Sequence, residues 1–289
     1  MTGTAAVALP RRLASLVRIE HTVFALPFAY VGAFLSVDAW PGLASVLWIT
    51  VAMVGARTLA MSLNRLVDSE IDARNPRTAM RELPSGALAR SQVWLLCLLS
   101  LALFLVAVFQ LDPIVRWLWP IPVAMFAVYP YLKRITWLCH LWLGACLGLA
   151  PVGAWLAMTG HAPWEAWAIG GAVLLWVAGF DLFYSLFDQE HDRAEGLHSW
   201  AVRFGESGVF TGARAFHAAA VILLAASGLG LDVSFFYWAG VVVTAALLVY
   251  EHSLVRPGDL RRLDAAFFTM NGVISLVFFA FVALDVLVT

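Results

Sequence analysis

Five polar residues, in two places along an otherwise apolar chain, have the types and the spacing of a cation site. Asn64, Asp68 and Asp72 follow one another at intervals of four, so on a helix they lie along one face. Asp188 and Asp192 repeat this interval after another long apolar run. Carboxylate oxygens suit the hard ion Mg²⁺, which commonly takes one or two carboxylates and leaves its other positions to water and phosphates. The spacing therefore indicates a magnesium site shared with a diphosphate.

Basic residues near these acids offer the positive charge that a diphosphate also needs. They are Arg74, Arg77, Arg81, Lys133, Arg134 and Arg203. Guanidinium groups match phosphate oxygens with paired hydrogen bonds, and a lysine supplies a mobile point charge. The alternative is that they reflect only the excess of positive charge on the cytoplasmic side of membrane proteins. That alternative explains their side of the membrane but not their nearness to the acids.

The composition indicates the kind of protein in which these polar residues lie. Of the 289 residues, 62% are hydrophobic and 13% are charged. A soluble domain averages about 45–50% apolar and about 25% charged residues. We therefore predict one all-α polytopic membrane domain over residues 1–289, not a soluble enzyme. Cys97, Cys139 and Cys146 are unclustered in apolar runs, so we expect them to be small core residues.

Nine apolar runs have about the 17–25 residues that a helix needs to cross a bilayer. They cover residues 18–37, 42–68, 91–110, 114–131, 138–158, 164–187, 208–229, 233–252 and 265–287. The breaks between them carry turn-forming residues, as at 40–42, 111–113, 159–163 and 257–259. We therefore predict nine transmembrane helices, with further short helices in the cytoplasmic loops.

The lysines and arginines predict how these helices are oriented. With nine spans and a cytoplasmic N-terminus, 16 of the 18 basic residues fall in cytoplasmic segments or at the adjoining helix ends. Arg116 falls on the outer side and Arg57 falls within a span. The C-terminus is then expected outside, in a bacterial cytoplasmic membrane. An even number of spans separates the two acidic stretches, so both are expected at the cytoplasmic face.

A weak internal repeat relates the two acidic stretches to each other. Aligning Asp68 with Asp188 and Asp72 with Asp192 matches the second predicted span to the sixth. Two such four-helix units in parallel orientation would bring both acidic helix ends to one central cavity, as repeats do in other membrane proteins. The repeat therefore predicts a shared site at that cavity.

Four segments resemble the motifs of the UbiA-type intramembrane prenyltransferases, and the resemblance covers essentially the whole chain. The first motif region is 64–86, where the family's Asn-x3-Asp-x3-Asp is met and residues 77–86 are similar to its Arg-Thr-x2-Arg-x-Leu-Pro-x-Gly segment. Residues 129–136 resemble its Tyr-Pro-x2-Lys-Arg-x-Thr segment. The second motif region, 181–203, resembles its pattern Asp-x2-Tyr-x3-Asp-x3-Asp-x3-Gly-x2-Ser.

Two residues depart from the family pattern. Arg65 stands where many members have Asp, and Glu70 adds a carboxylate between Asp68 and Asp72. The sequence around 63–78 is most similar to a bacterial 4-hydroxybenzoate polyprenyltransferase-like subgroup, part of which serves menaquinone synthesis by the futalosine route. The resemblance implies polyprenyl transfer from an allylic diphosphate to an aromatic, hydroxybenzoate-type acceptor. Diphosphate would be released, in the biosynthesis of ubiquinone or menaquinone.

The resemblance also implies the ligands of the site. Mg²⁺ is the expected cofactor, and its ligands would be Asp68, Asp72, Asp188 and Asp192. The diphosphate would bind Asn64, Arg77, Arg81, Lys133 and Arg134. The ring of Tyr184 would stabilise an allylic cation. The expected partners are a polyprenyl diphosphate, an aromatic acceptor and membrane lipid, and no nucleic acid.

Four residues are candidates for binding the aromatic acceptor. The candidates are Arg18, Arg57, Asp181 and Asn271, which are polar residues in apolar surroundings. A charged group within a membrane segment is costly, so Arg57 is a functional candidate by default. A carboxylated phenol favours a basic partner, for which Arg18 or Arg57 are candidates. A purely structural role stays open for each of them.

Two other functions also stay open. An ion-coupled transporter would place acids within the membrane, on helices that Gly or Pro interrupts. Here the acids lie at the ends of the predicted helices, beside an arginine-rich loop, which disfavours a transporter. The same transfer chemistry on a dihydroxynaphthoate, a glycerol phosphate lipid, a haem or a chlorophyll precursor would change the acceptor and leave the site intact.

Overall fold

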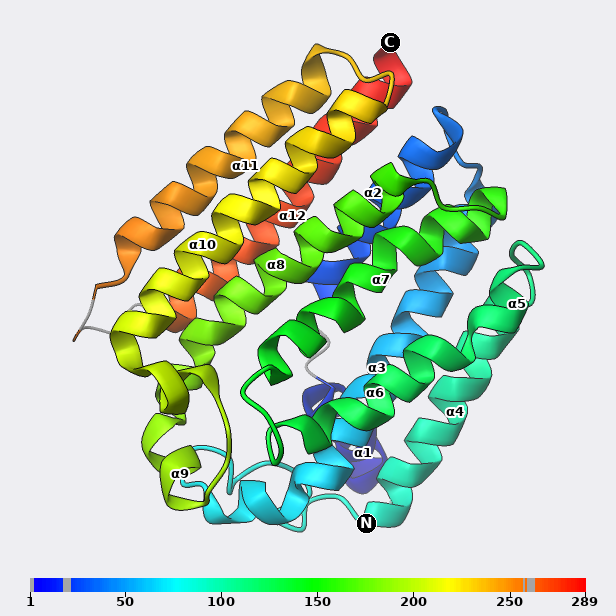
Figure 1. Ribbon diagram of the computed structural model, residues 1–289. Coiled ribbons are helices and arrows are strands. Elements are labelled where there is room, and N and C mark those ends of the chain that lie inside the picture. Colours follow the sequence, from blue (N-terminus) through cyan, green and yellow to red (C-terminus); the bar gives the residue numbers. More distant parts are fainter. Residues whose placement is uncertain (1–2, 18–21, 257, 259–262) are drawn as a thin grey trace.

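The chain is all-helical over the part that the computed structural model describes, which is residues 3–17, 22–256, 258 and 263–289 (Figure 1). The helices are α1 (Gly3–Leu16), α2 (Thr22–Val37), α3 (Leu43–Arg74), α4 (Arg90–Val108), α5 (Val115–Leu118), α6 (Pro120–Leu132), α7 (Cys139–Thr159), α8 (Trp164–Phe187), α9 (Gln189–Ala194), α10 (Trp200–Gly230), α11 (Phe235–Leu254) and α12 (Leu263–Val288). Each predicted apolar range overlaps a helix, and the range 114–131 overlaps both α5 and α6. The all-α prediction is confirmed.

Seven helices of the described chain are long and apolar enough to cross a membrane. They are α3, α4, α7, α8, α10, α11 and α12. The two remaining predicted spans coincide with α2, which has 16 residues, and α6, which has 13 residues. Both are shorter than the roughly 17–25 residues of a typical span. The chain is therefore an integral membrane protein, and the count of nine spans stays a prediction.

The predicted breaks contain the expected turn chemistry. Gly42 precedes α3 with φ of 83°, and Gly160 ends α7 with φ of 73°. These left-handed conformations are open to glycine because it has no Cβ atom. At the break between α4 and α5, the Asp112 carboxylate accepts a hydrogen bond from the backbone N–H of Ile114 at 2.9 Å. The break at 257–259 lies mostly outside the described residues.

Helices α2 and α7 lie between two groups of helices (Figure 1). One group contains α3, α4 and α6, and the other contains α8, α10, α11 and α12. Helix α7 packs closely against α2 and α8, because glycines, which have no Cβ atom, face backbone carbonyl groups at these contacts. A Cβ atom at Gly32 of α2 would clash with the carbonyl of Pro151, and one at Gly144 would clash with that of Leu174 in α8. Small residues of this kind let membrane helices approach closely.

All three cysteines are buried and have free thiols. Cys97 and Cys146 belong to one apolar cluster with Leu59 and Leu66 of α3. The expectation that the cysteines are core residues is confirmed.

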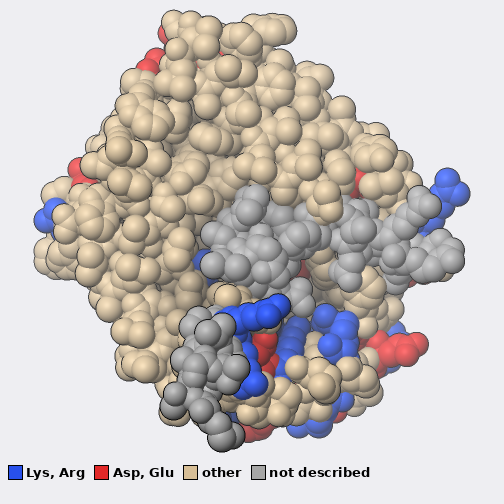
Figure 2. Space-filling view, turned by 180° about the vertical axis from the view of Figure 1, so that it is seen from behind, with Lys and Arg blue, Asp and Glu red and all other residues tan. Residues whose placement is uncertain are grey.

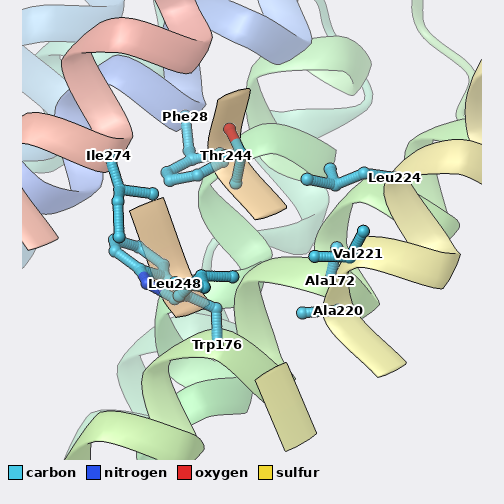
Figure 3. A pocket seen from close by; sticks show the side chains of 9 residues that line it. All are labelled: Phe28, Ala172, Trp176, Ala220, Val221, Leu224, Thr244, Leu248 and Ile274. Atoms are coloured by element: carbon cyan, nitrogen blue, oxygen red, sulfur yellow. The ribbon is translucent and has the colours of Figure 1, made fainter. Parts of the chain in front are cut away.

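A small apolar cavity lies among α2, α8, α10, α11 and α12 (Figure 3). Its lining residues are Phe28, Ala172, Trp176, Ala220, Val221, Leu224, Thr244, Leu248 and Ile274. Its volume is about 10 Å³, which is close to the smallest space that holds one water molecule. The cavity is therefore too small for a prenyl chain or an aromatic acceptor, and no motif acid lines it.

Candidate active site

The first acidic motif lies on one continuous helix, as the spacing predicts. Asn64, Asp68 and Asp72 all belong to α3, which continues to Arg74. The Asn64 amide donates a hydrogen bond to Asp68 Oδ2 at 3.0 Å. This bond joins side chains one helical turn apart, so they share a face of α3. Arg65, the departure from the family pattern, is also buried, and its Nη1 lies 4.0 Å from Asp72 Oδ2.

The second acidic motif crosses a helix break. Helix α8 ends at Phe187, and Asp188 is both its C-cap and the N-cap of α9. The backbone N–H of Asp192 donates to the Asp188 carbonyl at 2.7 Å, so the two acids stay one turn apart. Tyr184 lies on α8 and Asp192 on α9. Tyr184 and Asp192 therefore do not share one continuous helical face, because the chain leaves the helical conformation at Asp188.

Two arginines of the segment after α3 each bind one motif acid. Arg77 Nε donates to Asp188 Oδ1 at 2.9 Å, and its Nη2 donates to Asp188 Oδ2 at 2.5 Å. Arg81 Nη1 lies 2.7 Å from Asp72 Oδ1 and 2.8 Å from Asp72 Oδ2. One short segment thus holds an acid of each motif.

Lys133 and Arg134, which follow α6, repeat this arrangement. Lys133 Nζ forms an ion pair with Asp192 Oδ1 at 2.8 Å. Arg134 Nη2 forms an ion pair with Asp68 Oδ1 at 3.2 Å. Neighbouring cations therefore connect the two motifs, and each motif acid has a different basic partner.

These residues lie at one end of the molecule. Figure 2 shows lysine and arginine side chains gathered around acidic ones near its lower edge, the end at which Figure 1 places α9 and the segment after α3. The structure therefore brings both acidic motifs and the four predicted diphosphate-binding cations to a common site.

The two acids of the second motif differ in their electrostatics. Burial alone would raise the pKa of Asp188, but the hydrogen bonds and charge of Arg77, with a hydrogen bond from Asn75, hold that pKa below its usual range. Burial raises the pKa of Asp192, and the charge of Lys133 opposes this shift. Asp188 is therefore the more readily ionised of the two.

The chemistry of the donor set fits a divalent cation bound together with a diphosphate. Within the described residues, no group of three or more Asp, Glu, His or Cys side chains is close enough to hold a metal by itself. Mg²⁺ commonly needs only one or two carboxylates when phosphate and water complete its shell. Each motif supplies two carboxylates one turn apart.

Tyr184 lies in a row of aromatic rings along α8. Its ring centroid is 6.4 Å from that of Phe180 and 6.3 Å from that of Phe187. The Tyr184 side chain is partly buried. This row gives α8 an aromatic surface that leads toward Asp188.

The candidate acceptor residues lie on separate elements. Arg18 lies outside the described residues. Arg57 is partly buried on α3, and Asn271 is buried on α12. Asp181 Oδ2 lies 2.6 Å from Nδ1 of His140 on α7. Asp181 is therefore held by a side chain that the sequence analysis did not single out.

Three further polar residues that the sequence analysis missed support the site. The Asn75 amide donates to Asp188 Oδ1 at 2.9 Å. Arg74 Nε donates to Glu195 Oε2 at 2.8 Å, and His140 accepts at Nε2 from the Trp200 backbone N–H at 3.2 Å. The sequence could have indicated Asn75 as a site residue, because it lies between the basic residues Arg74 and Arg77. Nothing in the spacing connects His140 with Asp181 or Glu195 with Arg74.

These features define an all-helical integral membrane protein in which two acidic motifs meet two basic segments. The chain belongs to the UbiA prenyltransferase family, whose model matches residues 25–279. This membership confirms the resemblance seen in the motifs and decides against the transporter alternative.

The chain is similar over most of its length to curated 4-hydroxybenzoate octaprenyltransferases. It is 33% identical to that of Methylobacillus flagellatus over 257 residues, which are 88% of this chain and 86% of the relative. It is 30% identical to that of Aromatoleum aromaticum over 250 residues, which are 86% of this chain and 84% of the relative.

Solved structures share the fold. A UbiA homolog from Aeropyrum pernix K1 superposes with a TM-score of 0.84 and 34% identity, covering 93% of this chain and 99% of that one. A UbiA homolog from Archaeoglobus fulgidus bound to DMAPP and Mg²⁺ gives a TM-score of 0.75 and 20% identity, covering 95% of this chain and 99% of that one.

Proposed function

We propose that this protein transfers a polyprenyl group from an allylic polyprenyl diphosphate to a hydroxybenzoate-type aromatic ring in respiratory quinone biosynthesis. The observation that carries the proposal is the pairing of each motif acid with its own cation at one site. Such a set of charges suits a diphosphate and the divalent cation that accompanies it. Membership of the UbiA prenyltransferase family and the names of the curated relatives support this reaction.

Asp68, Asp72, Asp188 and Asp192 would hold Mg²⁺ against the diphosphate. The bound ion would neutralise the charge of the diphosphate and make it a better leaving group. Mg²⁺ is our choice among divalent cations because it combines few carboxylates with phosphate oxygens. Asn64, already hydrogen-bonded to Asp68, would orient that carboxylate or bind the diphosphate directly.

Arg77, Arg81, Lys133 and Arg134 would bind the diphosphate oxygens. Each of these cations is paired with a motif acid in the structure. A diphosphate held by those acids through Mg²⁺ would therefore lie close to the cations. As the bond between carbon and the diphosphate oxygen breaks, negative charge grows on the leaving group. Fixed cations that face this charge stabilise the transition state more than the ground state.

The broken bond leaves a positive charge on the allylic carbon, which the faces of aromatic rings can stabilise. Tyr184 would do this, supported by Phe180 and Phe187 along α8. A ring carbon of the acceptor then bonds to the allylic carbon, and the acceptor ring loses a proton. The surrounding apolar helices would keep out water, which would otherwise consume the cation.

Four residues would bind the aromatic acceptor. Arg18 or Arg57 would bind its carboxylate, and Asp181 and Asn271 would add hydrogen bonds. A dihydroxynaphthoate, as in menaquinone synthesis, is the runner-up acceptor because the sequence around 63–78 resembles that branch as well. Glycerol phosphate lipids and haem or chlorophyll precursors are more distant alternatives.

We also propose nine spans, arranged as two four-helix repeats around a central cavity, with the site on the cytoplasmic face of a bacterial inner membrane. The strong bias of basic residues toward one side supports this orientation. The N- and C-terminal ends lie at opposite ends of the bundle (Figure 1), as an odd number of spans requires. The N-terminus would be cytoplasmic and the C-terminus outside.

One assay tests the reaction and ranks the acceptors. Purified protein in phospholipid vesicles is incubated with farnesyl or octaprenyl diphosphate, Mg²⁺ and each acceptor in turn, and product masses are determined. We expect prenylated 4-hydroxybenzoate. If dihydroxynaphthoate is the only acceptor that is prenylated, the protein acts in menaquinone synthesis instead. Folded protein that prenylates no phenolic acceptor would contradict the proposed function.

A further inference from the structure

A groove of about 660 Å³ lies on the side of α3 that faces away from the motif acids. Residues of α3 form its floor, and α4 and α6, which both pack against α3, form its walls. An α-helix turns by about 100° per residue. Leu63 and Glu70 of the floor therefore lie on the face of α3 opposite Asp68 and Asp72.

The groove is apolar along its length and basic at one end. Leu63, Val67, Trp94 and Ala127 are among its apolar lining residues. Arg74, Arg90 and Arg134 line the end near the candidate site, where Glu70 is the one acidic lining residue. Trp94 is 51% exposed and Tyr131 is 47% exposed. Aromatic side chains at this level are typical of the boundary between lipid chains and headgroups.

We propose that this groove binds an anionic membrane phospholipid. Its phosphate would lie among Arg74, Arg90 and Arg134, and an acyl chain would follow Leu63, Val67 and Trp94. Arg74 also binds Glu195 and Arg134 also binds Asp68, whereas Arg90 donates to two neutral groups, the Ser69 hydroxyl and the Leu66 carbonyl. Arg90 is therefore the arginine most available to a phosphate, and basic pockets between membrane helices bind acidic headgroups. Leu63 and Arg74 are separated along α3 by about 16 Å at 1.5 Å per residue. This length is about half of a hydrocarbon core of ~30 Å, so it matches one leaflet.

Arg134 connects the groove with the candidate active site. It lines the groove, donates to the Val67 carbonyl at 3.0 Å, and donates to Asp68 Oδ1 at 3.2 Å. A lipid phosphate in the groove would share this guanidinium with Asp68. Lipid binding would therefore weaken the hold of Arg134 on Asp68 and make that carboxylate more available to a metal.

Direct measurement of lipid binding tests the site without relying on activity. The full chain in detergent is titrated with phosphatidylglycerol or phosphatidylcholine, and bound lipid is counted by native mass spectrometry. We expect the wild type to prefer phosphatidylglycerol. Arg90→Gln should weaken phosphatidylglycerol binding about fivefold, since one arginine near anionic lipid contributes ~1 kcal/mol. Equal affinity for the two lipids would overturn the proposal.

Arg116→Gln is the matched control. Arg116 lies on α5, at the end of the bundle away from the candidate site (Figure 1), and donates to the Leu111 carbonyl at 3.3 Å. Its replacement should leave phosphatidylglycerol affinity unchanged. If Arg116→Gln and Arg90→Gln weaken binding equally, the lipid responds to overall charge and the groove is not its site.

Ala127→Trp tests the apolar part of the groove. Ala127 is exposed on α6, so an indole there fills the groove without disturbing packed residues, and thermal unfolding should be unchanged. We expect it to weaken phosphatidylglycerol binding at least fivefold. Unchanged binding would overturn the proposal, and so would displacement of the lipid by farnesyl diphosphate, because the groove would then belong to the substrate.

Activity in defined vesicles tests the connection through Arg134. We expect the wild type to be more active in phosphatidylcholine vesicles that contain phosphatidylglycerol than in phosphatidylcholine alone. Arg90→Gln should lose this increase and keep the activity seen in phosphatidylcholine. If Arg90→Gln keeps the full increase, the effect does not pass through the groove. Phosphatidylglycerol binding that leaves wild-type activity unchanged would also overturn the connection.

Discussion

Arg77 donates two hydrogen bonds to Asp188, a residue 111 positions further along the chain. This contact connects the segment after the first motif with the second motif. Arg81, from the same segment, binds Asp72 of the first motif. The segment after α3 is therefore shared by both motifs, so loss of one of its residues should affect the site as a whole.

Asp188→Asn should lower kcat/KM for the prenyl diphosphate at least about 100-fold, because a metal–diphosphate site loses a charged ligand worth several kcal/mol. The amide has nearly the same shape, so the thermal unfolding temperature should change little. The control is Glu190→Gln, which changes an exposed side chain on α9 and should leave the kinetics unaltered. Wild-type kinetics for Asp188→Asn would remove Asp188 from the metal site.

Lys133→Met should destabilise the protein by about 2 kcal/mol, because it leaves the buried Asp192 carboxylate without its cation. Breaking a fully buried pair costs ~3–5 kcal/mol, but the Lys133 side chain is 36% exposed, so solvent screening reduces the loss. Chemical unfolding in detergent measures the change. In the double variant with Asp192→Asn, stability should recover while activity stays low. Recovery of activity as well would mean that this pair has only a structural role.

Removing divalent cations with EDTA should abolish turnover, and Mg²⁺ should restore it. Ca²⁺ should restore much less, because it favours 6–8 oxygen ligands at longer distances than the compact Mg²⁺ shell. Isothermal titration should show that farnesyl diphosphate binds more tightly when Mg²⁺ is present. Turnover that persists after exhaustive chelation would contradict the proposed cofactor.

Tyr184→Phe should keep most of the activity, whereas Tyr184→Leu should lower kcat about tenfold. An aromatic face contributes ~1–2 kcal/mol to stabilising a nearby cation in a dry site, and both Tyr and Phe provide that face. Single-turnover measurements with saturating diphosphate isolate this step. Equal activity in the two variants would exclude a role for the Tyr184 ring, and loss in both would point to its hydroxyl group.

The sequence by itself determined much of the site. Carboxylates at helical spacing, arginines directly after them and long apolar runs indicate a membrane protein with a metal–diphosphate site. The helix predictions succeeded because an apolar run in a membrane must satisfy its backbone hydrogen bonds internally. This requirement is local, so residue order is enough to reveal it. The predicted span 164–187 ends where α8 ends, but the short helix α9 that follows Asp188 was not placed. Four-residue spacing looks the same in a continuous helix and in two helices joined at a cap.

Only the tertiary structure decided which side chains meet. Lys133 and Arg134 are neighbours in sequence, yet they bind Asp192 and Asp68 on different helices. The pairing of Asp181 with His140 depends on the packing of α7 against α8. Glu70 lies between two motif acids in sequence but lines the groove on the opposite side of α3. Such contacts depend on how helices approach and rotate against one another, and these quantities are set by long-range packing rather than by the spacing of residues along the chain.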